Sequence, residues 1–576
     1  MNCTKRYLNE NNLIAVSSDK TNRFVVTSED KHIDKTRNLL LDTSNYRMIN
    51  QSKSKQIEAQ ANKLIDSFCK NSYSKNQIER LKSCGTRPAS FKTFIKDHKE
   101  PDENGFPLRP IASTVNSPTK KVDWLITQIL NQLAKLVPSS LSSTESLIDV
   151  FKNFKSVNLN DKQFISLDVK NLYPSIPISY GIECVVKFAE DNWDKINSFG
   201  LSINNLKKGI SFIAYNYEIE FDNVTYLQTK GCAMGSHYGP PFAIITVHFI
   251  ETEALKRLRI LGIKPPIYYR YIDDIIMGPF EHDMSIYNKI LNCFNSINDN
   301  IQFTIEVPEN NTLNFLDISI FITDNKICYA WYSKPTHSEI TLHKDSWLPQ
   351  HVKNNYVYTS TSRISSRCSS SPLKQKSIYK FKNRLRKNNY SNRDLKPRIK
   401  CKPRNNRYNE NNVKFSINFI NDSCNRKLNR LINKYKLPVT LISKPNKTTS
   451  QYFSRKTNYK HSNCELCDTI DCNYPCDVRF VVYEFKCNYC SKSYIGQTNR
   501  PFRIRYEEHK RSLALRNKTS ALAEHSKNEH SDRLTISDFS VHFLAKHKSP
   551  LENRLAEARF ISENRPELNR KHELVA

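Results

Sequence analysis

Residues 268–278 read YYRYIDDIIMG, and this stretch decides the fold because two adjacent aspartates interrupt a run of strand-forming residues. The pattern predicts a β-hairpin with Asp273 and Asp274 at or beside its turn, although a plain turn would explain both equally well. Upstream, FISLDVKNLYPSIP places Asp168 at the end of another apolar strand in the same manner. Carboxylates that meet in this way repel each other unless divalent cations bind between them. The pattern therefore favours a two-metal phosphoryl-transfer site that holds Mg²⁺, or Mn²⁺ in its place.

The segment between these strands, residues 228–243, reads QTKGCAMGSHYGPPFA and contains Gly231, Gly235 and Gly239. Glycine tolerates positive φ and close contacts, so the segment fits either a backbone that approaches a nucleotide or duplex, or a plain loop before a helix. Strand-like runs alternate with helix-compatible stretches such as 122–137, which predicts an α+β domain with an antiparallel sheet. These runs are 163–169, 217–223, 267–277, 301–307 and 313–322.

The composition indicates a nucleic-acid partner. The chain has 576 residues, enough for about three domains, and carries 88 Lys and Arg against 57 acids, a net charge of +31. Such an excess favours a polyanion. The composition favours nucleic acid over a membrane surface and predicts no membrane partner, because no apolar stretch reaches the roughly 20 residues that span a bilayer. Residues 1–18 also lack the apolar run of a secretory signal, so we expect an intracellular, nuclear protein.

Residues 374–460 are rich in Lys, Arg, Asn and Ser, poor in acids and free of Gly. We expect a basic connector that is helical around 415–436 and otherwise loosely ordered. A solvated linker and a surface that grips nucleic acid fit this composition equally well, and KFKNRLRK within it fits a nuclear-import signal.

The ordered series SLDVKNLYPSIP, GCAMGSHYGPP and RYIDDIIM resembles motifs A, B and C of a reverse transcriptase palm. The flanking segments narrow the resemblance to the reverse transcriptase of Penelope-like retroelements. It extends from residue 17 to residue 343, which leaves room for missing residues upstream of Met1. The flanking segments are SSDKTNRFVVTS, FKTFIKDHKEPDENGFPLRPIASTVNSPT, FTIEVPENNTLNFLDISIF and YSKPTHSEITLH.

This resemblance implies a role for each matched residue. Asp168 and Asp273 would hold two magnesium ions with Asp274 beside them, and Tyr173 would stack under the sugar and reject a 2′-hydroxyl, which favours dNTPs. Arg109 would contact the incoming triphosphate, as suits a forked guanidinium. The residues that would line the pocket for the templating base and the dNTP are Gln228, Met234 and Gly235. One position departs from the family, since His237 stands where a proline usually follows the serine of motif B.

Residues 481–510 read VVYEFKCNYCSKSYIGQTNRPFRIRYEEHK, two short strands followed by a helix. Arg505 and His509 fall at i and i+4, on one helical face. The bare pattern fits a small DNA-binding α/β domain with a solvated basic helix. As a set it resembles the GIY-YIG endonuclease domain, which follows the reverse transcriptase in Penelope-like elements. The first motif is VVY instead of GIY, but it keeps the tyrosine.

The GIY-YIG resemblance implies a phosphodiesterase site with one divalent metal held by Glu557, in LENRLAEARFISENRPELN. Tyr483 or His509 would assist the attacking water, and Arg505 would counter the developing charge. The remaining motif residues are Tyr494 and Gly496.

Two groups of cysteines indicate zinc. The first combines Cys487 and Cys490 with His525 and His530, which are ligand types and spacings of tetrahedral structural sites, and the family carries such a set. The second, in which the spacing alone suggests a zinc knuckle or inert thiols with equal weight, consists of Cys464, Cys467, Cys472 and Cys476.

Together these features predict a multidomain α+β protein: a right-hand reverse transcriptase with fingers, palm and thumb, a basic partly helical connector, and a small α/β nuclease. We expect an N-terminal segment at 1–75, fingers and palm at 76–325, a thumb-like segment at 326–372, the connector at 373–460, and the Cys-rich segment with the endonuclease at 461–576.

The expected function is target-primed reverse transcription. The chain would nick a DNA target and extend the freed 3′-hydroxyl as primer by copying an RNA template, binding the RNA–DNA hybrid as one chain or as a homo-oligomer. Two alternatives stay open: a decayed or host-adopted copy that only binds nucleic acid, and an intron maturase that pairs a reverse transcriptase with a nuclease.

Overall fold

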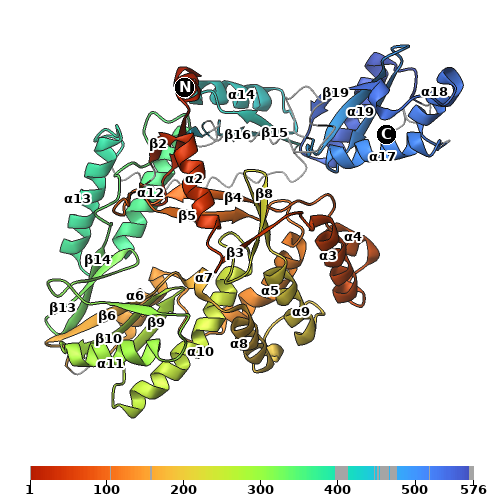
Figure 1. The fold of residues 1–576 in the computed structure, drawn as a ribbon. Helices are drawn as coiled ribbons and strands as arrows, with labels where there is room; N and C mark the ends of the chain where they lie inside the picture. The colour runs from red at the N-terminus through yellow and green to blue at the C-terminus, as the bar shows by residue number, and fades with distance from the viewer. Residues whose placement is uncertain are drawn as a thin grey trace.

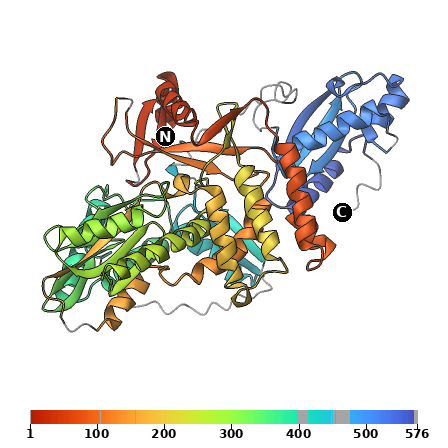
Figure 2. The same cartoon turned by 60° about the horizontal axis from the view of Figure 1, so that its bottom comes forward.

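The computed structural model describes residues 2–395 except 22, 104, 156 and 157, residues 413–446, 448, 449, 453 and 466, and residues 476–569 except 518. Figures 1 and 2 show the C-terminal residues, in blue, at one side of the molecule. They lie beside helices α3 (Ser54–Cys69) and α4 (Lys75–Leu81). Within the described residues, no helix has both the length and the apolar character that a membrane crossing requires.

The palm is a four-stranded antiparallel sheet in the order β11 (Phe303–Glu306), β6 (Lys162–Val169), β10 (Asp274–Glu281) and β9 (Ile267–Tyr271). This confirms the antiparallel sheet expected from the strand pattern. Both faces are covered, which explains the continuous apolar run of β10. Ile275 and Met277 pack into the core formed with the helices, whereas Ile276 packs with Phe315 on the opposite face.

Helices cover the face of the palm sheet that carries Ile275 and Met277, and together they build the largest hydrophobic core. The longest is α10 (Gly239–Ile260), which packs against α5 (Lys120–Lys135), α8 (Ile178–Glu190) and α11 (Met284–Asn295). The shorter helices of this region are α7 (Leu172–Ser175), η1 (Trp193–Lys195) and α9 (Ile203–Tyr215), whereas α6 (Thr144–Asn153) packs on the opposite face of the sheet.

The fingers contain a five-stranded sheet in the order β3, β8, β7, β4, β5, in which β4 and β7 run parallel. A separate hairpin of β1 and β2 near the N-terminus pairs Ser17 with Phe24 and leaves residues 18–23 as its loop. The bounds are β1 (Leu13–Ser17), β2 (Phe24–Ser28), β3 (Tyr46–Ile49), β4 (Ala89–Ile95), β5 (Leu108–Ser113), β7 (Glu218–Phe221), β8 (Val224–Gln228), α1 (Asn2–Glu10) and α2 (Glu29–Leu40).

The thumb-like region follows the palm and combines a small antiparallel sheet with two helices. Its strands are β12 (Leu313–Phe315), β13 (Ile318–Thr323) and β14 (Lys326–Trp331), and its helices are α12 (Gln350–Ser366) and α13 (Ser371–Lys387). The two helices share a core of Ile364, Phe381 and Leu385. Helix α13 runs across the boundary expected at residue 372, because its apolar residues pack on α12.

The described part of the connector is a β–α–β unit. Strands β15 (Val413–Asn418) and β16 (Val439–Lys444) pair in parallel, and α14 (Asp422–Lys434) joins them. The sequence predicts a helix around 415–436, and this prediction is wrong for residues 415–418, which belong to β15. Val413, Phe415 and Ile417 alternate with polar residues, which is the period of a strand.

The C-terminal domain is an antiparallel sheet in the order β18 (Ser493–Thr498), β17 (Val481–Cys487) and β19 (Phe539–Lys546). Its helices are α17 (Phe502–Ala514), α18 (Ala521–His530) and α19 (Pro550–Asn564), with a short turn η2 (Ile536–Asp538) before β19. Tyr483, Phe485 and Phe502 form its buried core.

A fully buried ion pair links the β9–β10 hairpin to α10. The Nε of Arg270 lies 2.8 Å from the Oε2 of Glu251. The same guanidinium donates from Nη1 to the carbonyl of Ile272 at 2.9 Å and from Nη2 to the carbonyl of Ile244 at 2.8 Å. Ile272 has a positive φ of 58° and opens the turn, so Arg270 stabilises a backbone conformation that a β-branched residue rarely adopts.

Replacing Arg270 by Met should destabilise the palm, because the Glu251 carboxylate would then be buried without its partner. Removing one member of a buried ion pair costs about 3–5 kcal/mol. The control is Arg257→Met, which breaks a half-exposed ion pair with Glu253 within α10. This substitution should cost less than about 1 kcal/mol. Chemical unfolding of the full chain measures both variants, and equal losses would contradict the special role of Arg270.

Candidate functional site

Three carboxylates meet at one end of the palm sheet. Asp168 on β6 stands directly opposite Asp274 on β10, and Asp273 precedes Asp274 in the hairpin turn. Strand β11 completes the arrangement, with Thr304 opposite Asp168 on the other side of β6. The expected hairpin with its aspartates at the turn is therefore confirmed, and Asp168 lies beside it through strand pairing.

The carboxylates repel one another in this position. Burial and the charges of Asp273 and Asp168 raise the pKa of Asp274 to about 7. Burial, Asp273 and Glu306 raise the pKa of Asp168. Grouped oxygen donors with excess negative charge suit a hard divalent cation, which would remove the repulsion. The donor set therefore fits magnesium at Asp168 and Asp273.

Tyr173 is the aromatic residue beside the carboxylates. Burial and the negative charge of Asp273 raise the pKa of its hydroxyl to about 12. Its carbonyl accepts a hydrogen bond from the amide of Cys232 at 2.8 Å. A Cβ on Gly231, which has a φ of 70°, would lie 2.4 Å from the carbonyl oxygen of Tyr173 and from Pro174. The loop that begins motif B can therefore contact motif A only with glycine at this position.

The rest of this loop contacts the fingers. A Cβ on Gly235, with a φ of 122°, would lie 2.2 Å from the carbonyl oxygen of Ala112 on β5. The carbonyl of Met234 accepts from the amide of Ala112 at 2.9 Å. Gln228 is buried and donates from Nε2 to the carbonyl of Lys230 at 2.9 Å. Gly231 and Gly235 thus permit contacts between segments of the protein's own backbone.

His237, the departure from the family pattern, has a partner that the sequence did not reveal. Its amide donates to the Oδ2 of Asp123 at 2.9 Å, and the amide of Tyr238 donates to Oδ1 at 2.8 Å. Asp123 is fully buried on α5. A proline at 237 would lack the first donor, so this chain uses the N–H of His237 to fix the start of α10. The only hint in the sequence of this partner was the position of Asp123 inside the apolar stretch 122–137.

Arg109 lies on β5, opposite Phe94 of β4. Its Nε is 2.9 Å from the Oδ1 of Asp19, in an ion pair without the alignment of a hydrogen bond. Asp19 comes from the N-terminal hairpin loop, so three segments meet at the fingers end of the site.

The C-terminal domain brings a second polar cluster together around Tyr483. Gly496 on β18 stands opposite Tyr483 on β17, and a Cβ there would lie 2.8 Å from the Tyr483 hydroxyl and 2.9 Å from Tyr494. The fully buried Tyr483 hydroxyl accepts from the Nε of Arg505 at 3.0 Å and lies 3.0 Å from the Nε2 of His509.

Burial and the neighbouring positive charge keep His509 neutral. Burial and then the positive charge of Arg505 lower the pKa of His509 to about 3. Burial and neighbours that include Tyr494 and Glu557 raise the pKa of Tyr483. Helix α19 packs against β17 and β18 and carries the half-buried Glu557 to the same cluster. The structure thus brings together the six residues that the sequence pattern assigned to a GIY-YIG site.

Four zinc-type donors gather at the other end of β17. Cys487, Cys490, His525 and His530 each offer a donor atom, and all four atoms lie within 4.8 Å of one another. Two thiolates and two imidazoles at these positions fit a tetrahedral structural zinc site. Of the second predicted set, Cys476 is buried, whereas Cys464, Cys467 and Cys472 lie outside the described residues.

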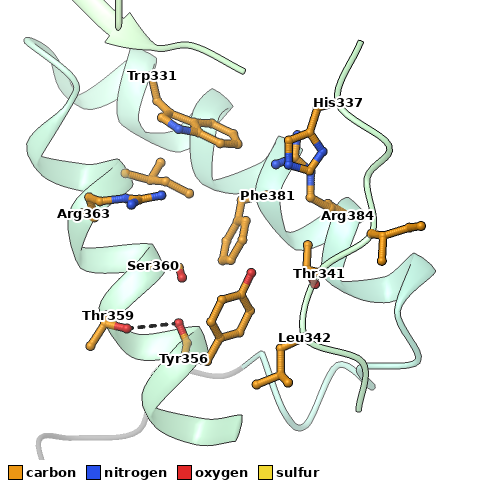
Figure 3. Close-up of a pocket in the computed structure, with 12 residues that line it drawn as sticks. Trp331, His337, Thr341, Leu342, Tyr356, Thr359, Ser360, Arg363, Phe381 and Arg384 are labelled. Atoms are coloured by element: carbon orange, nitrogen blue, oxygen red, sulfur yellow. Dashed lines mark hydrogen bonds between the residues drawn. The ribbon is translucent and has the colours of Figure 1, made fainter. Parts of the chain in front are cut away.

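A cavity of about 630 Å³ lies in the thumb-like region, away from both clusters (Figure 3). Aromatic side chains of Trp331, Tyr356 and Phe381 and the guanidiniums of Arg363 and Arg384 line it. Arg384 stacks on Trp331, with its guanidinium carbon 5.3 Å from the ring centroid. None of the palm carboxylates lines this cavity.

The chain was compared with curated proteins, solved structures and protein-family models. No curated protein matches the chain. Solved structures that resemble it include telomerase from Candida albicans in complex with a fragment of telomeric RNA (10% identity, TM-score 0.44, 65% of this chain and 63% of that chain). Others are apo telomerase from Candida tropicalis (12%, 0.40, 65% and 66%) and the Sicinivirus RNA-dependent RNA polymerase (12%, 0.36, 58% and 67%). The chain spans less than two thirds of each telomerase chain.

The family model described as reverse transcriptase (RNA-dependent DNA polymerase) matches residues 101–305, a range that contains Asp168, Asp273 and Asp274. The chain therefore contains a reverse transcriptase domain.

Proposed function

We propose that this chain copies RNA into DNA at the palm and nicks DNA at its C-terminal domain, as in target-primed reverse transcription by a Penelope-like retroelement. The observation that carries the proposal is the strand register that sets Asp168 beside Asp274, with Asp273 in the adjoining turn, inside a reverse transcriptase domain. The net charge of +31 suits a template RNA, a DNA target and primer, and their hybrid. Because the target would be genomic DNA, we also propose a nuclear location.

In the polymerase reaction, the primer 3′-hydroxyl attacks the α-phosphate of a dNTP, and pyrophosphate leaves. Asp168 and Asp273 would hold magnesium, which when bound activates the hydroxyl and counters the phosphate charge. Arg109 would bind the triphosphate from the fingers side. Tyr173 would lie under the sugar of the dNTP, where its ring excludes a 2′-hydroxyl. Motif B, fixed at its helix start by Asp123, would support the templating base.

In the nuclease reaction, water attacks a phosphodiester and releases a 3′-hydroxyl. The Tyr483 oxygen accepts from Arg505, so its own proton is directed at the Nε2 of His509. The neutral His509 accepts this hydrogen bond and positions the Tyr483 hydroxyl, and one of the two would assist the attacking water. Arg505 would counter the charge on the phosphate, and Glu557 would hold a divalent metal that polarises it. The Cys487, Cys490, His525 and His530 site would hold a structural Zn²⁺.

Asp273→Ala should abolish RNA-templated DNA synthesis. Loss of a metal ligand removes several kcal/mol of transition-state stabilisation, which means a rate at least about 100-fold lower. Primer extension with magnesium measures the effect, and Asp299→Ala, which removes an exposed acid, is the control. Full activity in Asp273→Ala would refute the polymerase site. A chain that binds the hybrid but makes no DNA would instead favour the decayed-copy alternative.

Glu557→Ala should end DNA nicking and leave primer extension unchanged, because α19 lies in the C-terminal domain and not in the palm. Conversion of supercoiled to nicked plasmid measures the first activity. Glu563→Ala, on the same helix and exposed beside Arg559, is the matched control and should nick normally. Loss of both activities in Glu557→Ala would argue against two independent sites.

Cys490→Ser should reduce the zinc content by one ion per chain, because it removes one of four ligands. Elemental analysis of the purified full chain measures this without reference to activity. The exposed Cys3→Ser variant should keep the zinc of the unchanged chain. The C-terminal domain of Cys490→Ser should also unfold at lower temperature. Unchanged zinc in Cys490→Ser would remove this site from the proposal.

A further inference from the structure

The two helices of the thumb-like region carry a large excess of positive charge. From Gln350 to Lys387, which includes α12 and α13, the chain has ten Lys and Arg and neither Asp nor Glu. A segment of this kind attracts a polyanion. These helices form much of the wall of the cavity in Figure 3, so an anionic ligand would meet favourable charge as it approaches.

Three aromatic rings form a continuous apolar wall of this cavity. The ring centroid of Phe381 is 6.3 Å from that of Trp331 and 6.5 Å from that of Tyr356. Figure 3 shows the Trp331 and Tyr356 rings on either side of Phe381. Phe381 is buried, but Trp331 and Tyr356 are only half-buried and keep accessible ring surface. A flat unsaturated ring can stack on such a surface.

Two polar groups in the cavity wall are buried without a hydrogen-bond partner. Arg384 on α13 is 7% exposed, and its Nη2 donates to the Oγ of Ser333 at 2.8 Å. Its Nε has no partner in the part of the chain that the structure describes, and neither has the hydroxyl of Thr341. Both side chains line the cavity. Because an unpartnered buried donor is costly, a ligand with hydrogen-bond acceptors would be stabilised here.

The wall that contains Thr341 is held in place by the buried Asn388 at the end of α13. The Asn388 side chain accepts from the amide of Thr341 at 3.1 Å and donates to the carbonyl of Glu339 at 2.9 Å. The Glu339 carboxylate forms an ion pair with Lys387. Of the residues that the structure describes, no Asp or Glu lines the cavity. The cavity is therefore preformed and has no acid in its wall.

A second cation, Arg363 on α12, lines the same cavity and is exposed. Arg367, one turn further along, is committed to ion pairs with Asp317 and Glu145. Within the described ranges, the guanidinium of Arg363 forms no ion pair. An exposed guanidinium beside a cavity with aromatic walls suits a phosphate attached to a group that enters the cavity.

The ligand that fits all these features is a nucleotide with an unpaired base. Such a base stacks on aromatic rings and guanidinium planes and forms hydrogen bonds at its edge, while its phosphate binds a cation. The volume of about 630 Å³ lies within the range of small-molecule sites. A base inside a duplex is stacked on both faces and paired at its edge, so it cannot enter. The nucleotide must therefore belong to a single strand.

We propose that the cavity of the thumb-like region binds one unpaired nucleotide of a single nucleic-acid strand. The base lies against Trp331 and Tyr356, and its edge bonds to Arg384 and Thr341. The phosphate binds Arg363. This inference goes beyond both proposed reactions, because a chain that neither makes nor cuts DNA would still bind a strand here. The template RNA and an unpaired strand of the DNA target share this chemistry, and the test separates them.

The test is equilibrium binding of the full chain to a single-stranded oligonucleotide and to an abasic strand of the same length. Tyr356→Leu removes a ring and keeps an apolar side chain. It should weaken binding of the base-containing strand about fivefold to a hundredfold and leave the abasic strand unaffected. The matched control is Tyr358→Leu, which removes an exposed ring of α12 that does not line the cavity. This control should bind both strands like the unchanged chain.

RNA and DNA strands measured in parallel identify the source of the nucleotide. A loss confined to RNA assigns the cavity to the template, and a loss confined to DNA assigns it to the target. An equal loss shows that the cavity accepts both strands. Equal affinities of Tyr356→Leu and the unchanged chain for every base-containing strand would overturn the inference. Equal losses for base-containing and abasic strands would also overturn it, because phosphate contacts alone would then explain the binding.

Fluorescence provides a second measurement that does not depend on how Tyr356→Leu folds. Trp331 is one of four Trp in the chain, and a base stacked on it should quench its emission. Trp331→Phe, which keeps an aromatic ring, should lose that part of the quench. The same quench should occur in Asp273→Ala, which separates this inference from the polymerase proposal. A quench of equal size in Trp331→Phe and the unchanged chain would contradict the proposed site.

Discussion

The Arg270 guanidinium, fully buried beneath the β9–β10 turn, holds the backbone that carries Asp273. It pairs with Glu251 and donates to the carbonyls of Ile244 and Ile272, so all three of its nitrogens have partners. A buried charge is tolerated only with such partners. The pair stabilises a turn with positive φ at Ile272 and joins it to α10, the longest helix of the core. The position of the palm carboxylates therefore depends on an interaction that contains none of them.

The fixed turn brings several negative charges together at the end of the palm sheet. Strand register brings Asp168 and Asp274 together beside Asp273, and burial with the charges of the other two carboxylates raises the pKa of Asp274 to about 7. Positive side chains from outside the palm sheet oppose this concentration of negative charge. Lys20 and Lys334 act on Asp168 from the N-terminal hairpin and from the thumb-like region. Segments that lie more than three hundred residues apart in the chain thus converge on one negatively charged site.

The sequence predicted the parts of this arrangement that local pattern controls. Runs of apolar strand-forming residues predicted β6, β9, β10 and β11, and the adjacent aspartates predicted the hairpin. The sequence did not predict which groups from distant segments would pair. Asp123 occupies a helix whose pattern is that of plain core, and only the structure shows that its carboxylate receives two amides of motif B. Residues 415–418 were expected to be helical, because the following helix signal masked a short alternating strand.

The same distinction applies to the C-terminal domain. The motif spacing predicted which residues gather around Tyr483, because strand pairing and an i, i+4 helix place them there. Their attachment to the fingers was not predictable, since it depends on contacts between distant segments, among them a close approach at Gly85. A Cβ on Gly85, which has a φ of 65°, would lie 2.4 Å from the Cδ1 of Ile504 on α17. Only a glycine lets the fingers loop approach this helix so closely.

Helix α17 therefore contacts the fingers on one side and the Tyr483 cluster on the other. Arg503 lies 2.7 Å from Asp477, which also pairs with Arg87 of the fingers, whereas Arg505 faces Tyr483. Residues two apart on a helix point in different directions, so one side can contact the fingers while the other faces the Tyr483 cluster. A rigid helix cannot move one side alone. Any shift of the docked side relative to the fingers must displace Arg505 and His509 with it, so the contact that holds the domain also determines where its polar cluster lies relative to the palm.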